Sequence, residues 1–233
     1  MMYRELSQLL AAGASDLESV RRLIVDENIL GKSTAAAKAS ALRHLRNLYG
    51  LGANSVVTGG LETLWGFDAE SRPVLALLCA LARDPLLRDS ADVVLGAPVG
   101  SRVGAQEIAE RLGTLHPGRF AAGMLGGISR NCASSWTQSG HLAGRAKKLR
   151  TRPAATPATA AYAALLASLA GFGGPALIDS PWMDVLDLST NERLAVLRRA
   201  EAQGLLRVRA AGDVVEVVLD PLMSRIEAQA AHV

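Results

Sequence analysis

Leucine and alanine recur at helical spacing along most of this chain, in runs that glycine and proline interrupt. The two residue types make up about a third of the 233 residues, and both favour helices. Apolar residues account for 49% of the chain and charged residues for 20%. This composition excludes a mainly disordered protein, which would need low hydrophobicity and high charge. The pattern therefore predicts a mainly α-helical protein built from helical modules.

The first predicted module spans residues 1–50. Apolar spacing predicts helices near 3–12 and 17–24, a break at 28–31, and a third helix that starts at Ser33 or Thr34 and ends before Gly50. A short helix, a tight turn and a helix that begins with small polar residues and bases outline a helix-turn-helix. The candidate DNA-binding residues of this module are Lys32, Thr34, Lys38, Arg43 and Arg46.

The second predicted module spans residues 51–152. Its first half is predicted as helical scaffold, with a turn at Gly59-Gly60 and a short apolar helix at 74–82. A helix at 105–112, a turn at 114–118 and a longer helix at 119–136 then outline a second helix-turn-helix. Glycines at 123, 126 and 127 each disfavour a helix by about 1 kcal/mol relative to alanine, so they either permit a close helix crossing or break the helix near 126.

The charge of the chain is unevenly distributed, because residues 111–178 contain no Asp or Glu. This acid-free stretch carries eight Lys and Arg residues, five of them at 145–152. A solvated basic loop is one interpretation, but the absence of acids favours a surface that faces phosphates. The candidate DNA-binding residues of this region are Arg119, Arg130, Asn131, Ser134, Arg145, Lys147, Lys148, Arg150 and Arg152. We expect simultaneous replacement of Lys147, Lys148 and Arg150 by Glu to abolish DNA binding.

The third predicted module spans residues 153–233. Residues 153–178 carry no charge, but their prolines and glycines and their weakly apolar Ala and Thr predict a buried helix near 157–170 rather than a membrane span. Ser189 and Glu192 form a capping box that starts another helix. Two strands, 205–209 and 214–219, follow with a turn at 211–213. A helix followed by a short β-hairpin outlines a winged-helix-like unit, a type of unit that contacts either DNA or protein.

The sequence offers no catalytic residue, metal site or cofactor motif. The four histidines lack the spacing of metal ligands, and there is no phosphate-binding glycine loop. Two cysteines, Cys79 and Cys132, are expected to be reduced thiols. The first residues lack the apolar segment and cleavage site of a signal peptide, so a cytoplasmic location without membrane association is expected. We therefore expect a protein that is not an enzyme and needs no cofactor.

Three segments resemble the BrxA family of bacteriophage exclusion (BREX) defence systems. They are the turn at 27–34 (ENILGKST), the run at 134–142 (SSWTQSGHL) with its basic tail, and the C-terminal pattern L-x-x-L…GLL-x-V. The resemblance implies a mainly helical DNA-binding accessory protein with two helix-turn-helix units, encoded with a DNA methyltransferase and ATPases. The hairpin expected at 205–219 and the glycines at 123–127 depart from the family's pattern.

The preferred interpretation is a non-enzymatic double-stranded DNA-binding protein that contacts mainly phosphates and has little sequence specificity. One alternative is a protein–protein interaction adaptor within a defence complex, in which the basic stretch meets an acidic partner. Another is a transcriptional regulator, which would usually require a symmetric dimer on a palindromic site.

Overall fold

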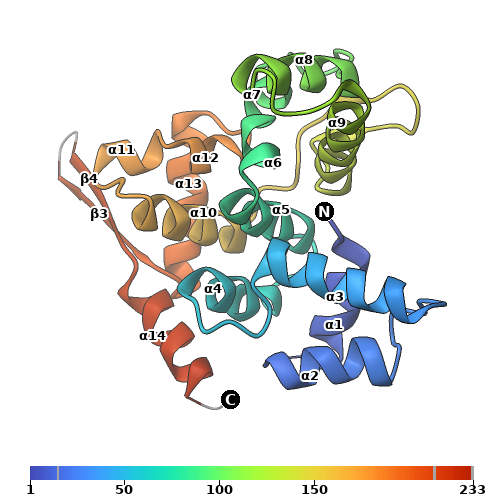
Figure 1. Ribbon diagram of the computed structural model, residues 1–233. Coiled ribbons are helices and arrows are strands. Elements are labelled where there is room, and N and C mark those ends of the chain that lie inside the picture. Colours follow the sequence, from blue (N-terminus) through green and yellow to red (C-terminus); the bar gives the residue numbers. More distant parts are fainter. Residues whose placement is uncertain (15, 212–213, 232–233) are drawn as a thin grey trace.

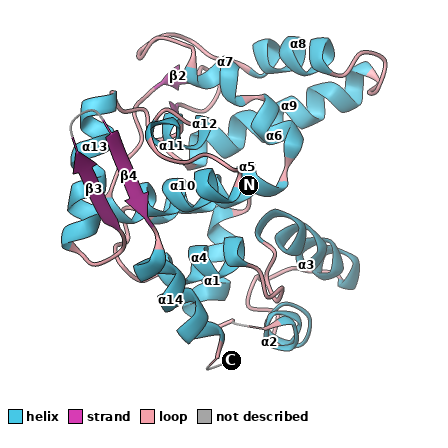
Figure 2. Ribbon diagram, turned by 90° about the vertical axis from the view of Figure 1, so that its left-hand side faces the viewer, coloured by secondary structure: helices cyan, strands magenta, loops and turns pink. Residues whose placement is uncertain are grey.

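The computed structural model describes residues 1–14, 16–211 and 214–231. The protein is mainly helical, as predicted, with two small antiparallel hairpins (Figures 1 and 2). The N-terminal elements are α1 (Tyr3–Ala11), α2 (Leu17–Arg21), its π-helical continuation η1 (Arg22–Asp26), α3 (Ala35–Tyr49), α4 (Val56–Trp65) and α5 (Arg72–Arg83). The central elements are α6 (Pro85–Asp89), α7 (Ala91–Leu95), α8 (Ala105–Leu115), α9 (Ala122–Gln138), β1 (Leu142–Ala143) and β2 (Leu149–Arg150). The C-terminal elements are α10 (Pro157–Leu169), α11 (Pro175–Ile178), α12 (Pro181–Asp184), α13 (Thr190–Ala202), β3 (Arg207–Ala211), β4 (Val214–Val218) and α14 (Asp220–Ala230).

Helices α5 and α10 form the centre of the molecule. The residues of α5 from Val74 to Leu81 are at most 2% exposed, and so are those of α10 from Ala158 to Ala167. Both helices are apolar on all sides because other helices surround them: α5 packs on α3, α4, α9 and α10, and α10 also packs on α12 and α13. The two helices predicted near 74–82 and 157–170 are therefore confirmed as core helices. In the part of the chain that the structure describes, no helix has the length and apolar character needed to cross a membrane.

The prediction of a turn at Gly59-Gly60 is wrong, because both residues lie inside α4. A Cβ at Gly60 would lie 2.7 Å from Leu165 Cδ2 of α10, and a Cβ at Gly59 would lie 2.7 Å from Ile226 Cγ2 of α14. The two glycines therefore let α4 approach two neighbouring helices closely. This contact outweighs the poor helix propensity of glycine.

Local start signals place several helices where the sequence predicts them. The Thr34 side chain accepts a hydrogen bond from the Ala37 amide at the start of α3, and Gly50 ends that helix with a left-handed φ of 67°. Ser189 and Glu192 form the predicted capping box of α13. These signals need only neighbouring residues, so the sequence pattern is sufficient to find them.

Two further predictions concern α9 and the C-terminal hairpin formed by β3 and β4. Helix α9 runs without interruption through all three of its glycines, so it does not break near 126. Both predicted C-terminal strands are present, as β3 and β4, but β3 runs over Arg207–Ala211 rather than 205–209. The two strands pair antiparallel, with Arg207 opposite Val218. Residues 212–213 of the predicted turn between them lie outside the described residues.

Candidate nucleic-acid interface

The basic segment 142–150 forms a hairpin beside α9, and its loop projects beyond that helix at the right of Figure 1. Leu142 pairs with Arg150 and Ala143 with Leu149, and an isolated antiparallel bridge joins Leu149 to Arg102. Gly144 has a φ of 103°, and a Cβ there would collide with the Lys147 carbonyl oxygen. The tight turn therefore requires glycine at this position.

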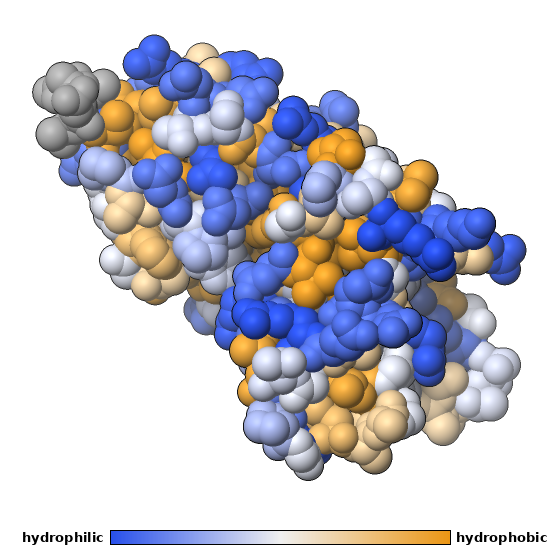
Figure 3. Space-filling view, turned by 90° about the horizontal axis from the view of Figure 1, so that it is seen from above, coloured by the Kyte–Doolittle hydropathy of each residue, from blue (hydrophilic) through white to orange (hydrophobic). Residues whose placement is uncertain are grey.

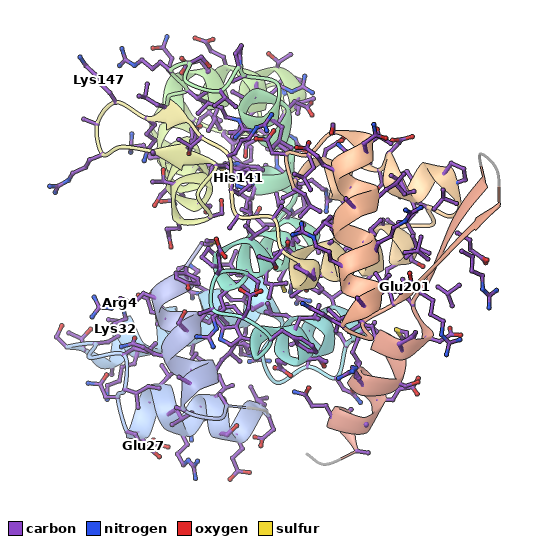
Figure 4. All side chains as sticks on the ribbon, turned by 180° about the vertical axis from the view of Figure 1, so that it is seen from behind. Arg4, Glu27, Lys32, His141, Lys147 and Glu201 are labelled. Atoms are coloured by element: carbon purple, nitrogen blue, oxygen red, sulfur yellow. The ribbon has the colours of Figure 1, made fainter. Side chains whose placement is uncertain are left out.

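Cations at the tip of this hairpin point into solvent. Arg145 and Lys147 are exposed, and neither forms an ion pair within the described structure. Figure 4 shows the Lys147 side chain extending away from the protein. The view from above (Figure 3) looks onto the α7–α8 end of the molecule, where strongly hydrophilic side chains gather around apolar surface. The hairpin thus offers unneutralised positive charge to an anionic partner.

Two arginines extend the cationic surface along the exposed part of α9. The Arg119 guanidinium lies 5.1 Å from the centre of the Phe120 ring, just before the helix. Arg130 folds back along α9, since its Nη1 lies 3.4 Å from the position of a Cβ at Gly126. A Cβ at Gly126 would make only an ordinary van der Waals contact with this flexible side chain. Among the described residues, no atom of another helix lies within 4 Å of a Cβ at Gly123, Gly126 or Gly127, so the close helix crossing that the sequence suggested is not found at these glycines.

The N-terminal turn of α9 is exposed and uncapped. Ala121 occupies the N-cap position without a side-chain hydrogen bond, and the first turn carries no acidic residue. Residues 121–124 are all exposed. The free backbone N–H groups and the helix dipole therefore add partial positive charge between Arg119 and Arg130.

Arg150 must be removed from the predicted DNA-binding residues, because it is 1% exposed. Its Nε donates to the Val94 carbonyl at 2.8 Å, and its Nη1 donates to the carbonyls of His141 and Thr151. Its Nη2 lies 3.0 Å from Asp187 Oδ1. The Arg150 guanidinium therefore ties together α7, the hairpin and the loop before α13. A phosphate cannot reach it.

Two neighbours of Arg150 are also engaged. The Lys148 Nζ donates to Thr137 Oγ1 at 2.7 Å, and the Arg152 Nε lies 3.9 Å from Asp187 Oδ2. The Arg152 side chain remains 63% exposed. At the start of the acid-free stretch, Arg111 Nη2 lies 2.5 Å from Asp92 Oδ2. The number of free cations is therefore smaller than the sequence count.

A cation that the sequence analysis missed lies next to the hairpin. Arg102 is exposed, and its bridge to Leu149 places it beside β2. It precedes the acid-free stretch, so charge distribution along the sequence could not identify it. Only the pairing between distant segments brings it to the basic surface.

The structure divides the candidates of the first module into two groups. Lys32 Nζ lies 3.0 Å from Glu5 Oε1, Lys38 Nζ donates to the Val25 carbonyl at 2.8 Å, and Thr34 caps α3. These three side chains hold the module together. Arg43 and Arg46 are exposed and form no ion pair among the described residues.

Asn131 and Ser134 are exposed on α9, but they border a groove that α9 shares with α3. The groove has a volume of about 510 Å³, and His44 and Asn47 line its opposite side. These two candidates therefore lie beside the N-terminal module.

Two histidines and both thiols have structural positions. His141 Nδ1 lies 2.8 Å from Ser139 Oγ and its Nε2 lies 2.7 Å from the Val185 carbonyl, and burial lowers its pKa to about 4. His116 Nε2 lies 2.7 Å from Asp89 Oδ2. Burial raises the pKa of Cys79 to about 12 and that of Cys132 to about 11, so both thiols stay protonated. Within the described ranges, no three His, Cys, Asp or Glu side chains are grouped to hold a metal ion.

No protein family, no curated protein and no solved structure matches this chain.

Proposed function

We propose that α9 and the β1–β2 hairpin bind double-stranded DNA, without catalysing a reaction on it. The order of elements supports this proposal: α7, a segment paired through Arg102, α8, α9 and then a hairpin follow one another along the chain. A winged helix-turn-helix, in which the last helix and the hairpin loop approach the duplex, has a similar order of elements. The C-terminal order α12, α13, β3 and β4 is a second candidate unit of this kind.

The observation that carries the proposal is the set of exposed cations that lack an ion-pair partner in the described structure. They lie on the segment before α8, at both sides of the uncapped start of α9, and at the hairpin tip: Arg102, Arg119, Arg130, Arg145 and Lys147. Such cations neutralise backbone phosphates and release counterions from the duplex.

The exposed first turn of α9 favours binding with little sequence preference. Its first turns present Ala122, Gly123 and Met124, which cannot form the paired hydrogen bonds that read base edges. Phosphate contacts fix a protein on the duplex but carry no sequence information. The proposed protein therefore binds many sequences with similar affinity.

The resemblance to the BrxA family gives this binding a proposed setting. In that setting the protein is a cytoplasmic accessory component of a phage-defence system, with a DNA methyltransferase and ATPases as companions. DNA binding by the hairpin does not depend on this assignment, because it is argued from the exposed cations and the order of elements.

Fluorescence anisotropy with a 30-base-pair duplex of random sequence, at several salt concentrations, tests the proposal. The double variant Arg145→Gln/Lys147→Gln should bind more weakly, and its slope of log affinity against log salt should be shallower by about 1.8, which corresponds to two phosphate contacts. The matched control is Arg21→Gln/Arg22→Gln, which removes the same charge from side chains that pair with Asp26 and Glu27. Equal slopes for the hairpin variant and the wild type would refute the proposal.

A second candidate function, a protein–protein adaptor, is favoured by apolar surface near the hairpin. Val99 is 58% exposed and Leu149 is 46% exposed. The segments that carry them are joined by a hydrogen bond from the Gly100 amide to the Arg150 carbonyl. An adaptor would bind a partner protein through this apolar edge and would show no salt-dependent affinity for the random duplex.

A further inference from the structure

Three arginines from two helices line a hollow at the C-terminal end of α3. The hollow has a volume of about 370 Å³, and Arg43, Arg46 and Arg83 lie around it. Leu42 and Leu51 contribute apolar surface, and no Asp or Glu belongs to its lining. Its size falls in the range of small-ligand pockets. The side chains therefore define a concave site with positive charge and partly apolar walls.

Arg83 comes from the end of α5, and Gly50 makes room for it. The Arg83 Nε donates to the Asn47 carbonyl at 2.9 Å, which leaves both Nη groups available. Gly50 has a φ of 67°, and a Cβ there would lie 2.9 Å from Arg83 Nη1 and 2.5 Å from Thr58 Oγ1. The helix end is thus shaped so that a guanidinium can lie across it.

The charges of this hollow are not neutralised by the protein. Helix α3 contains no acidic residue, and Arg43 and Arg46 are three positions apart, a spacing that places their like charges side by side on one face of the helix. None of the three arginines forms an ion pair with a described residue. Lys32 and Lys38, in the same module, do have partners within the protein. The three guanidinium groups are therefore available to bind an anion.

We propose that Arg43, Arg46 and Arg83 bind a phosphate group. Guanidinium groups bind phosphate through paired N–H···O contacts, and three of them from two helices can surround one group. The phosphate belongs either to a free phosphorylated molecule or to the backbone of DNA. The proposal does not rest on DNA binding by α9 and the hairpin, because it concerns other residues.

Calorimetric titration with inorganic pyrophosphate at constant ionic strength tests the free-ligand source, and anisotropy with the 30-base-pair duplex tests the DNA source. The test variant is Arg43→Gln/Arg46→Gln, whose side chains are exposed and therefore not needed for folding. Arg83→Gln is a second variant, which removes the third guanidinium. The control is Arg21→Gln/Arg22→Gln, which removes the same charge as the first variant outside the hollow.

Pyrophosphate affinity at least tenfold weaker in the test variants, and within twofold of wild type in the control, assigns the site to a free phosphorylated molecule. If pyrophosphate does not bind the wild type, duplex affinity at least fivefold weaker in the test variants than in the control assigns the site to DNA. The proposal is overturned if neither probe distinguishes the test variants from the control. Failure of the hairpin proposal would appear separately, as unchanged duplex binding by Arg145→Gln/Lys147→Gln.

Discussion

Replacing Arg150 by methionine should destabilise the protein by about 3–5 kcal/mol, the range for removing one partner of a buried ion pair. The methionine keeps much of the side-chain volume but supplies no donor. The carbonyls of Val94 and His141 then lose a charged partner, and Asp187 loses the cation 3.0 Å from its Oδ1. Because the Asp187 side chain is 21% exposed, water solvates part of its charge, so we expect the lower end of the range.

Urea unfolding followed by circular dichroism measures this loss of stability. Arg145→Met is the matched control, since Arg145 is exposed on the same hairpin and its replacement should change the free energy of unfolding by no more than about 0.5 kcal/mol. In native conditions Arg145→Met should still weaken duplex binding. A loss below about 1 kcal/mol for Arg150→Met would refute the structural role of Arg150.

A double-mutant cycle with Asp187→Asn separates the ion pair from the carbonyl contacts. If Arg150 and Asp187 stabilise the fold through each other, the double variant should lose less stability than the sum of the two single variants. An additive result would assign the effect of Arg150 to the carbonyls of Val94 and His141 alone.

Four further substitutions probe burial and close packing. Burial lowers the pKa of His141 to about 4, so on acidification the imidazole is protonated in the unfolded state before it is protonated in the folded state. Wild-type stability should therefore fall as pH drops from about 6.5 to 4, and His141→Gln should remove this pH dependence from urea unfolding. Burial raises the pKa of Glu62 to about 7, so the folded state holds this proton more tightly than the unfolded state, and wild-type stability should fall as pH rises from about 4.5 to 7. Glu62→Gln should therefore raise the melting temperature at pH 8 but not at pH 4. Gly60→Ala should destabilise the protein, because the added Cβ would clash with α10. Gly123→Ala should stabilise the protein by up to about 1 kcal/mol, because its Cβ meets no atom within 4 Å. Urea unfolding measures both changes, and the same sign for both would contradict the packing argument.

Elements with local signals could be predicted from the sequence. The cap at Thr34, the capping box at Ser189 and the uncharged core helix α10 all depend on residues close together in the chain. The helix boundaries of α3 and α13 follow from those signals, because a cap satisfies the first free N–H groups wherever the rest of the protein lies.

Elements that depend on distant segments could not be predicted. The pair Gly59-Gly60 predicts a turn from sequence alone, because the close packing of α10 and α14 against α4 is not visible there. In the sequence, Arg150 is one of five bases in a basic run, and only the structure shows that Asp187 and the Val94 carbonyl surround it. Arg83 lies outside every basic run, and only the packing of α5 against α3 brings it to Arg43 and Arg46. In each case tertiary contact decides the role of the residue.

The difference between free cations and cations with partners in the protein changes the salt dependence expected for DNA binding. If all eight bases of the acid-free stretch contacted phosphates, the slope of log affinity against log salt would be about −7. The five free cations around α9 and the hairpin give a limit of about −4.5. A measured slope steeper than this limit would require cations from outside the proposed interface. The three arginines around the α3 hollow are the nearest candidates by chemistry, and Arg43→Gln/Arg46→Gln would then reduce the slope by about 1.8.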